Sequence, residues 1–161
     1  MELNTNMELS RVKGTWDQVK IALPDVLNTY EVDIEKAEGY LTLKGKTGAQ
    51  ALKEQTAWPA YYLMRRTEVS KLLKYMDSQV ESCRGRLHKK YAENYSRALG
   101  ERVTDKYINN EPEYLSYLEL YLEVEEIRDK LSAICDAFTS RGFSLRDWTV
   151  LKVAQLQDDL I

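Results

Sequence analysis

The sequence predicts an all-α fold built on an antiparallel, coiled-coil-like hairpin of two long helices, with short flanking helices. Only seven glycines and three prolines occur in 161 residues, too few turn residues for a many-stranded sandwich or barrel. Charged residues make up 30% of the chain and apolar residues 43%, a balance typical of amphipathic helices. Two long segments repeat apolar residues at alternating steps of three and four, the spacing of a coiled-coil seam.

Residues 1–58 form the first predicted region, a set of short helices separated by breaks. Apolar residues at helical spacing predict a helix from Met7 to about residue 22. Pro24 suits the first turn of a second helix that runs to about residue 43. A third helix is expected over 49–57, before Pro59.

Two glycines and two lysines predict a loop at 44–48, between the second and third of these helices. Gly45-Lys46-Thr47 within it matches part of the phosphate-binding loop of nucleotide-binding proteins. That motif needs an earlier glycine where this chain has Tyr40, and a buried strand should precede it. A phosphate site is therefore not predicted here.

Residues 59–161 form the second predicted region, the helical hairpin core with a C-terminal helix. The first long helix is expected from Pro59 to about Leu99, with Gly85 as a weak point in its interior and Gly100 after its end. Its apolar seam steps by four and three and consists of Val69, Leu73, Met76, Val80, Cys83 and Leu87.

A short helical turn over 104–109 is expected to join the two long helices. Asn110 is predicted as the N-cap of the second one, with Pro112 in its first turn. Gly142 is expected to end this helix, after which 144–147 form a capping box that opens a last helix to about residue 157. The seam of the second long helix consists of Tyr117, Leu120, Val124, Ile127, Leu131, Ile134 and Phe138.

Apolar side chains beside the second seam exceed what one partner helix can cover. We expect the N-terminal helices, through Trp16, Tyr30 and Trp58, or further copies of the chain to cover this surface. Homo-oligomerisation is therefore part of the fold prediction. The flanking apolar residues are Tyr114, Leu118, Tyr121, Leu122 and Cys135.

No residue pattern predicts an enzyme, a metal site or a cofactor. His88 lies among like charges in a segment expected to face solvent, and no nucleophile motif accompanies it. The carboxylates between residues 119 and 129 lack the histidine spacing of metal sites in helical bundles, so they indicate a solvated helix face. Cys83 and Cys135 fall at apolar helical positions, where a thiol behaves as a small hydrophobe rather than as a disulfide or zinc ligand.

No stretch of the sequence approaches the ~18 consecutive apolar residues that a membrane span needs. The first residues also lack the basic and apolar blocks of a secretory signal. We therefore expect a protein that does not enter a membrane and that stays in the cytoplasm.

Charge is distributed unevenly along the chain. Residues 65–106 carry eleven Lys or Arg and six Asp or Glu, whereas 107–161 carry five and eleven. Cations that neutralise phosphates release counterions, and interleaved aromatic rings offer bases a stacking surface, so the basic segment is a candidate for binding single-stranded DNA. A basic face that is only solvated, or is paired with the acidic helix of its own hairpin, is the open alternative. The candidate residues are Arg84, Arg86, Lys89, Lys90, Tyr91 and Arg97.

Residues 136–143, Asp-Ala-Phe-Thr-Ser-Arg-Gly-Phe, follow a long apolar helix and resemble the C-terminal half of the UvsY family of phage recombination mediators. Arg84-Gly-Arg-Leu87 is similar to the basic element that the family uses for single-stranded DNA. The likeness covers roughly residues 65–155, and the first 60 residues look different. Gly85 departs from the helix-favouring residue expected at that position.

This resemblance implies a small helical protein that assembles into a ring of six or seven copies in the cytoplasm of the infected host cell. It implies that Arg84 and Arg86 hold single-stranded DNA. Its partners would be a phage recombinase and the single-strand-binding protein that the recombinase replaces, in phage DNA recombination and repair. The alternative is a phage structural or assembly chaperone that acts through coiled-coil contacts without binding DNA.

Overall fold

A computed structural model of the protein describes residues 16–94 and 100–154. Four α-helices account for nearly all of these residues: α2 (Trp16–Leu41), α3 (Gly48–Asn94), α4 (Glu101–Ile108) and α5 (Pro112–Val153). No strand occurs in the two described ranges. The all-helical fold class is therefore confirmed, while oligomerisation stays a prediction.

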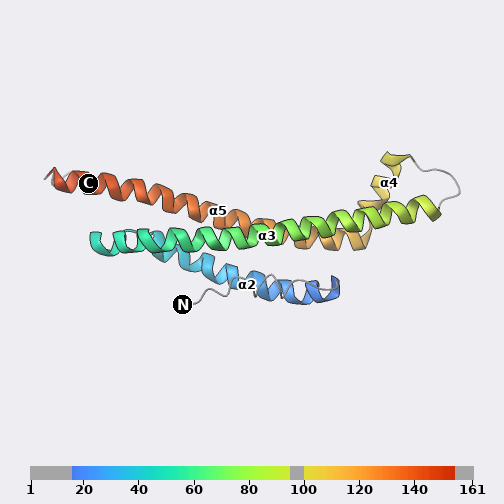
Figure 1. The fold of residues 1–161 in the computed structure, drawn as a ribbon, viewed down its shortest axis with the longest axis horizontal. Helices are drawn as coiled ribbons and strands as arrows, with labels where there is room; N and C mark the ends of the chain where they lie inside the picture. Colours follow the sequence, from blue (N-terminus) through green and yellow to red (C-terminus); the bar gives the residue numbers. More distant parts are fainter. Residues whose placement is uncertain (1–15, 95–99, 155–161) are drawn as a thin grey trace.

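The two longest helices form the predicted hairpin. Figure 1 shows α3 and α5 running antiparallel along most of their length, with α2 beside the pair. The short helix α4 lies at the end where the chain passes from α3 to α5. At the other end, the C-terminal part of α5 extends past the beginning of α3.

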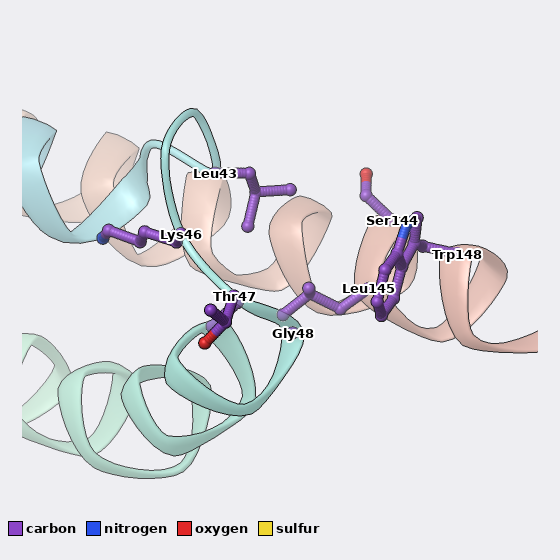
Figure 2. Close-up of a pocket in the computed structure, with 8 residues that line it drawn as sticks. Leu43, Lys46, Thr47, Gly48, Ser144, Leu145 and Trp148 are labelled. Atoms are coloured by element: carbon purple, nitrogen blue, oxygen red, sulfur yellow. The ribbon is translucent and has the colours of Figure 1, made fainter. Parts of the chain in front are cut away.

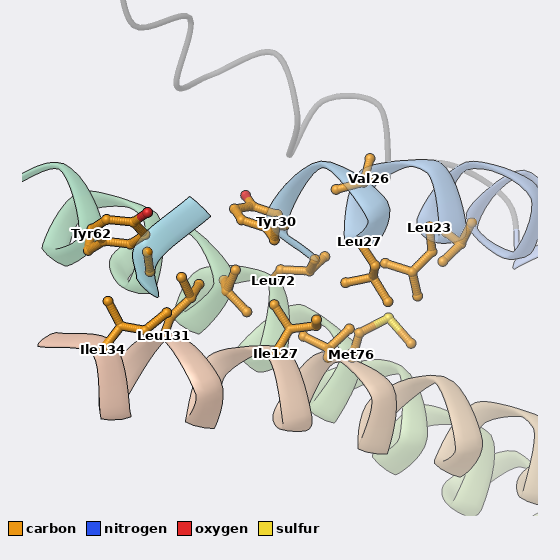
Figure 3. Packing of buried hydrophobic residues seen from close by; sticks show 14 of the residues in the cluster. Leu23, Val26, Leu27, Tyr30, Tyr62, Leu72, Met76, Ile127, Leu131 and Ile134 are labelled. Carbon is orange, nitrogen blue, oxygen red and sulfur yellow. The ribbon is translucent and has the colours of Figure 1, made fainter. Parts of the chain in front are cut away.

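The seam residues predicted from the heptads form the core. All of them are buried except Leu73 and Leu120, which are partly buried against the same core. Figure 3 shows that side chains from α2, α3 and α5 meet in the main cluster. A second cluster lies toward the α4 end of the hairpin and consists of Val80, Cys83, Leu87, Ile108 and Tyr117.

The N-terminal region covers part of the hairpin, as expected. Tyr30 of α2 is buried in the main cluster. Trp58 is partly buried against that cluster and stacks on Tyr40, with 3.7 Å between the ring centroids. The side chain of Trp16 and the predicted helix start at Met7 lie outside the part of the chain that the structure describes.

The helix break predicted before Pro24 is wrong, because α2 continues through this residue. Proline removes one helix hydrogen bond and crowds the preceding turn, at a cost of about 3 kcal/mol. Pro24 itself is exposed, whereas Val19, Leu23, Val26 and Leu27 on either side of it are buried. Burial of an aliphatic side chain stabilises by about 1.5–3 kcal/mol, so the four together outweigh the proline.

The helix start predicted at Pro59 is also wrong, because buried side chains on both sides of this proline hold the helix together. The helix α3 begins at Gly48, and the separate helix expected over 49–57 is its first part. Ala51 and Tyr62 are buried on either side of the proline. The predicted boundary between residues 58 and 59 therefore falls inside one continuous helix.

The start of α5 differs from the prediction in one detail. Glu111, not Asn110, is its N-cap residue, and no side chain caps it. The Asn110 side chain instead donates a hydrogen bond to the Lys106 carbonyl at 2.7 Å, at the end of α4. Pro112 lies in the first turn of α5, as predicted.

The helix end predicted at Gly142 is wrong, because α5 continues to Val153. Phe138 and Leu145 are buried on either side of the glycine, and their packing carries the helix through it. Ser144 was expected to cap a new helix, but its hydroxyl donates to the Ser140 carbonyl inside α5 at 3.2 Å. The end predicted near residue 157 lies outside the described residues.

Arg141 continues the α5 seam where the heptad pattern calls for an apolar residue, and its side chain is only 3% exposed. Its guanidinium donates to the carbonyls of Leu41 at 3.1 Å and Ala51 at 3.0 Å. It also donates to the Gln55 amide oxygen and to the Glu54 carboxylate, both at 2.9 Å. One side chain thus joins α5 to the end of α2 and the start of α3.

A second buried polar group lies between α2 and α3. Arg65 forms ion pairs with Asp33 and Glu68, each at 2.9 Å. The Tyr30 hydroxyl donates to Glu68 at 3.3 Å, and the Arg65 guanidinium lies 4.2 Å from the centroid of the Tyr30 ring. Glu68 is buried with its charge paired, so this group fixes the register of α2 on α3.

Two glycine substitutions are expected to change stability in opposite directions. A Cβ at Gly48 would lie 2.8 Å from the Trp148 indole, so Gly48→Ala should destabilise the protein by about 1 kcal/mol. A Cβ at Gly85 would meet nothing within 4 Å, so Gly85→Ala should stabilise α3 by about 1 kcal/mol. Chemical denaturation measures both, and a Gly48→Ala variant as stable as the parent chain would contradict the packing of α5 on the start of α3.

Candidate nucleic-acid interface

The basic cluster, defined as Arg84, Arg86, Lys89 and Lys90, occupies the C-terminal part of α3. Residues four apart lie above one another on a helix, so Arg84 and His88 share one side of α3 and Arg86 and Lys90 share another. The seam residues Cys83 and Leu87 are buried between these two sides. The buried seam therefore determines where the cations point.

Arg84 and His88 both contact α4. The Arg84 guanidinium donates to the Asp105 carboxylate at 3.0 Å, and His88 Nε2 lies 3.2 Å from the same oxygen. The pKa of Asp105 is lowered, because hydrogen bonds first from Arg84 and then from His88 stabilise its ionised form. His88, interpreted from the sequence as a surface residue, is in fact partly buried against this carboxylate.

Arg86 and Lys89 lie farther into solvent, with 59% and 76% of their side chains exposed. Arg86 donates to the Glu113 carboxylate at 2.9 Å and to the Tyr117 hydroxyl at 3.4 Å. Lys89 lies 3.8 Å from Glu93, one turn later in α3. Both cations are open to solvent on at least one side.

Lys90 and Tyr91 meet at Glu111. The Lys90 ammonium donates to the Glu111 carboxylate at 3.2 Å, and the Tyr91 hydroxyl donates to the same oxygen at 2.5 Å. These two hydrogen bonds, the one from Tyr91 first, lower the pKa of Glu111. The Tyr91 ring also stacks on Tyr107 of α4, with 5.7 Å between centroids and 25° between planes.

The sequence located the cations but not their partners. Asp105, Glu111 and Glu113 come from α4 and from the start of α5, and they pair with three members of the basic cluster. Ion pairs that stay in contact with water are weak, so a polyanion can compete for these cations. Arg97, the remaining candidate, lies outside the described residues.

Further cations lie along the same helix toward its middle. Lys71 and Lys74 are exposed on α3, roughly three to four turns before the basic cluster. They project from the helix that the basic cluster occupies, so positive charge extends along α3 beyond the candidate residues.

The loop between α2 and α3 borders a half-open cavity of about 310 Å³ against α5. Figure 2 shows Leu43, Leu145 and Trp148 around this space, with Lys46 extending toward α2 and away from Trp148. The Lys46 ammonium donates to the Gly39 carbonyl at 2.6 Å, at the end of α2. It is also paired with a glutamate of α3.

Thr47 in the same loop starts α3. The Thr47 amide donates to the Gln50 side chain at 3.0 Å, and the Gln50 amide donates to the Thr47 hydroxyl at 3.3 Å, which is a capping box. Gly45 takes a positive φ of 76°, a conformation that glycine favours. The Gly-Lys-Thr triplet therefore closes one helix and opens the next.

Within residues 16–94 and 100–154, no group of three or more His, Cys, Asp or Glu side chains is arranged to hold a metal ion. None of the helices described has an apolar stretch of the length that crossing a membrane requires.

The fold and the basic cluster define a class: elongated helical hairpins that present cations along one long helix. Comparison with known proteins adds no closer assignment. No family model, no curated protein and no solved structure matches the chain.

The contact between α4 and α3 is expected to weaken in acid. The lowered pKa values of Asp105 and Glu111 mean that their contribution to stability is complete above their unfolded-state pKa of about 4 and is lost as the pH falls through the lower folded-state values. The difference in melting temperature between the parent chain and Asp105→Asn/Glu111→Gln should therefore shrink from neutral pH to about pH 2. A difference that stays constant over this range would contradict the pairing.

Proposed function

We propose that this protein is a recombination mediator. It binds single-stranded DNA along α3 and helps to load a strand-exchange recombinase in place of single-strand-binding protein. It makes and breaks no covalent bond, and it acts in DNA recombination and repair in a phage-infected cell.

The observation that carries the proposal is the exposure of the basic cluster. Arg86, Lys89 and Lys90 keep 59%, 76% and 56% of their side chains accessible, although each faces a carboxylate. Ammonium and guanidinium groups held at a helix surface can each neutralise a backbone phosphate. The sequence similarity of Arg84-Gly-Arg-Leu87 to the basic element of UvsY-type mediators supports the same ligand.

Several copies acting on one strand would compensate for the small number of cations that a single chain offers. The whole chain has a net charge of −3, and a few cations alone bind DNA weakly at physiological salt. Linked sites raise avidity by roughly 10²–10⁴ when all can engage one strand together. The proposed homo-oligomeric ring would provide such linkage.

Exposed apolar side chains support an oligomer. Leu115 and Leu122 of α5 are about half exposed, at 46% and 51%. Phe143, Val150 and Val153, near the described end of α5, are exposed by 57%, 61% and 79%. A second copy would remove such side chains from water.

A displacement assay tests the mediator function. Single-stranded DNA is coated with fluorescently labelled single-strand-binding protein, and a strand-exchange recombinase from the same phage source is added with and without this protein. Faster exchange of one coat for the other, with no DNA cleavage or ATP hydrolysis by this protein alone, is the expected result. An unchanged exchange rate over a range of concentrations would contradict it.

A structural or assembly chaperone is the second candidate. The pairing of Arg84, Arg86 and Lys90 with carboxylates of the same chain favours it, because paired cations are less available to DNA. A chaperone of this class would oligomerise through its apolar surface in the same way. It would bind no single-stranded DNA at any salt concentration, and the two candidates are separated on that property.

A further inference from the structure

The segment from α4 to the start of α5 places three carboxylates on the basic cluster. Asp105 accepts from Arg84 at 3.0 Å, Glu111 from Lys90 at 3.2 Å, and Glu113 from Arg86 at 2.9 Å. These anions come from one short stretch of chain, and they occupy both sides of α3. Backbone phosphates of a bound strand would need the same donors.

The same segment also places an aromatic ring on Tyr91. The Tyr107 ring stacks on it at 5.7 Å between centroids. Aromatic side chains that bind single-stranded nucleic acid use the same ring face for bases. The chain therefore supplies from its own residues the two chemical features of a single strand of DNA. Its carboxylates correspond to the phosphates, and the Tyr107 ring corresponds to a base.

The helix α4 is a short element that packs on the C-terminal part of α3. It has eight residues, and no side chain caps its N-terminus. Helices this short are not stable by themselves in water. Ile108 and Thr104 are its buried side chains, and its other contacts with α3 include the partly exposed ion pairs of Asp105 and the Tyr107 stack. A polyanion that offered more charges could displace such an element.

We infer that 101–113 acts as an internal mimic of single-stranded DNA, competing with the nucleic acid for the basic cluster and for Tyr91. This inference rests on the proposed function. Occupation by the mimic lowers the affinity of a lone chain for DNA, and DNA binding displaces α4 from α3. The device would confine tight binding to conditions in which many cations engage one strand at once.

Neutralising the mimic tests the inference. Asp105→Asn/Glu111→Gln/Glu113→Gln is expected to bind a fluorescent single strand of deoxythymidines at least about tenfold more tightly than the parent chain at low salt. Its affinity should also fall more steeply with salt, by roughly 0.7 in log–log slope for each cation released. Tyr107→Ala alone should tighten binding severalfold, because it uncovers the face of Tyr91 on which Tyr107 stacks.

The matched control has the same change in charge at exposed carboxylates away from the cluster: Asp25→Asn/Glu35→Gln/Glu123→Gln. Circular dichroism checks that every variant is folded. If the parent chain binds and the mimic variant binds no better than the control variant, the inference is wrong and the proposed function stands. If neither the parent chain nor the mimic variant binds, the proposed function fails together with the inference. Tighter binding by the mimic variant alone supports both.

Discussion

Arg86→Ala/Lys89→Ala/Lys90→Ala is expected to lower the affinity for single-stranded DNA by about tenfold to a hundredfold at low salt. Each cation that contacts a phosphate contributes roughly 0.7 to the log–log slope of affinity against salt, so three lost contacts should flatten that slope by about 2. The three side chains are more than half exposed, and removing them leaves the buried seam of α3 intact. Anisotropy titrations at several salt concentrations measure both quantities.

The control for this prediction removes equal charge elsewhere. Lys36, Lys44 and Lys53 are exposed on α2, the following loop and the start of α3, and their replacement by alanine should change affinity by less than about threefold. Equal losses in the two variants would mean that net charge, and not the basic cluster, determines binding. That result would remove the basis for assigning DNA binding to α3.

Arg141→Ala is expected to destabilise the protein by about 3–5 kcal/mol, the usual cost of breaking a buried charged pair. The substitution removes the Arg141 guanidinium from the carbonyls of Leu41 and Ala51 and from the side chains of Glu54 and Gln55, and Glu54 keeps its ion pair with Lys46. It also creates a cavity where α5 meets the end of α2 and the start of α3. For a chain of this size the melting temperature should fall by about 10 °C.

Two further variants identify the cause of that loss. Arg141→Lys keeps the charge but cannot supply the planar fork of donors, so it should recover only part of the stability. Arg146→Ala, one turn later at a side chain that is 71% exposed, should change stability by less than about 0.5 kcal/mol. If Arg141→Ala were as mild as Arg146→Ala, the junction described for Arg141 would be incorrect.

The pairing of the two long helices could be predicted, because the apolar residues of a heptad repeat are those that become buried between paired helices. The seam in α5 was read as seven apolar positions, and six of them are buried and the seventh, Leu120, is partly buried. The pairing of two such seams then required only a short connection between the helices. The oligomer and the function have no such direct signal in the described contacts.

Helix boundaries were predicted less well, because side-chain packing outweighs the local effect of helix-breaking residues. Pro24, Pro59 and Gly142 each weaken a helix locally, yet each is flanked by buried side chains whose combined burial is worth more. Arg141 was missed for a related reason. A charged residue in an apolar repeat looks like the end of the buried seam, and only the folded structure shows the four acceptors that surround it.

The candidate interface could be predicted as a set of cations but not as a set of contacts. Arg84, Arg86 and Lys90 are basic in the sequence and exposed or partly exposed in the structure. Their partners depend on how α4 folds back onto α3, which follows from burial of Ile108 rather than from any local pattern. The sequence left open the alternative that these cations pair with the acidic helix of the hairpin. Arg86 and Lys90 do so, through Glu113 and Glu111 at the start of α5, whereas Arg84 pairs with Asp105 of α4.

Binding of single-stranded DNA by this protein is tested by one titration. A labelled single strand of about 30 nucleotides and a duplex of the same sequence are titrated with the full chain at about 50 mM and about 300 mM salt, with fluorescence anisotropy as the readout. We expect binding at low salt that weakens at high salt and that favours the single strand. No binding at either salt, or equal binding to the duplex, would contradict it.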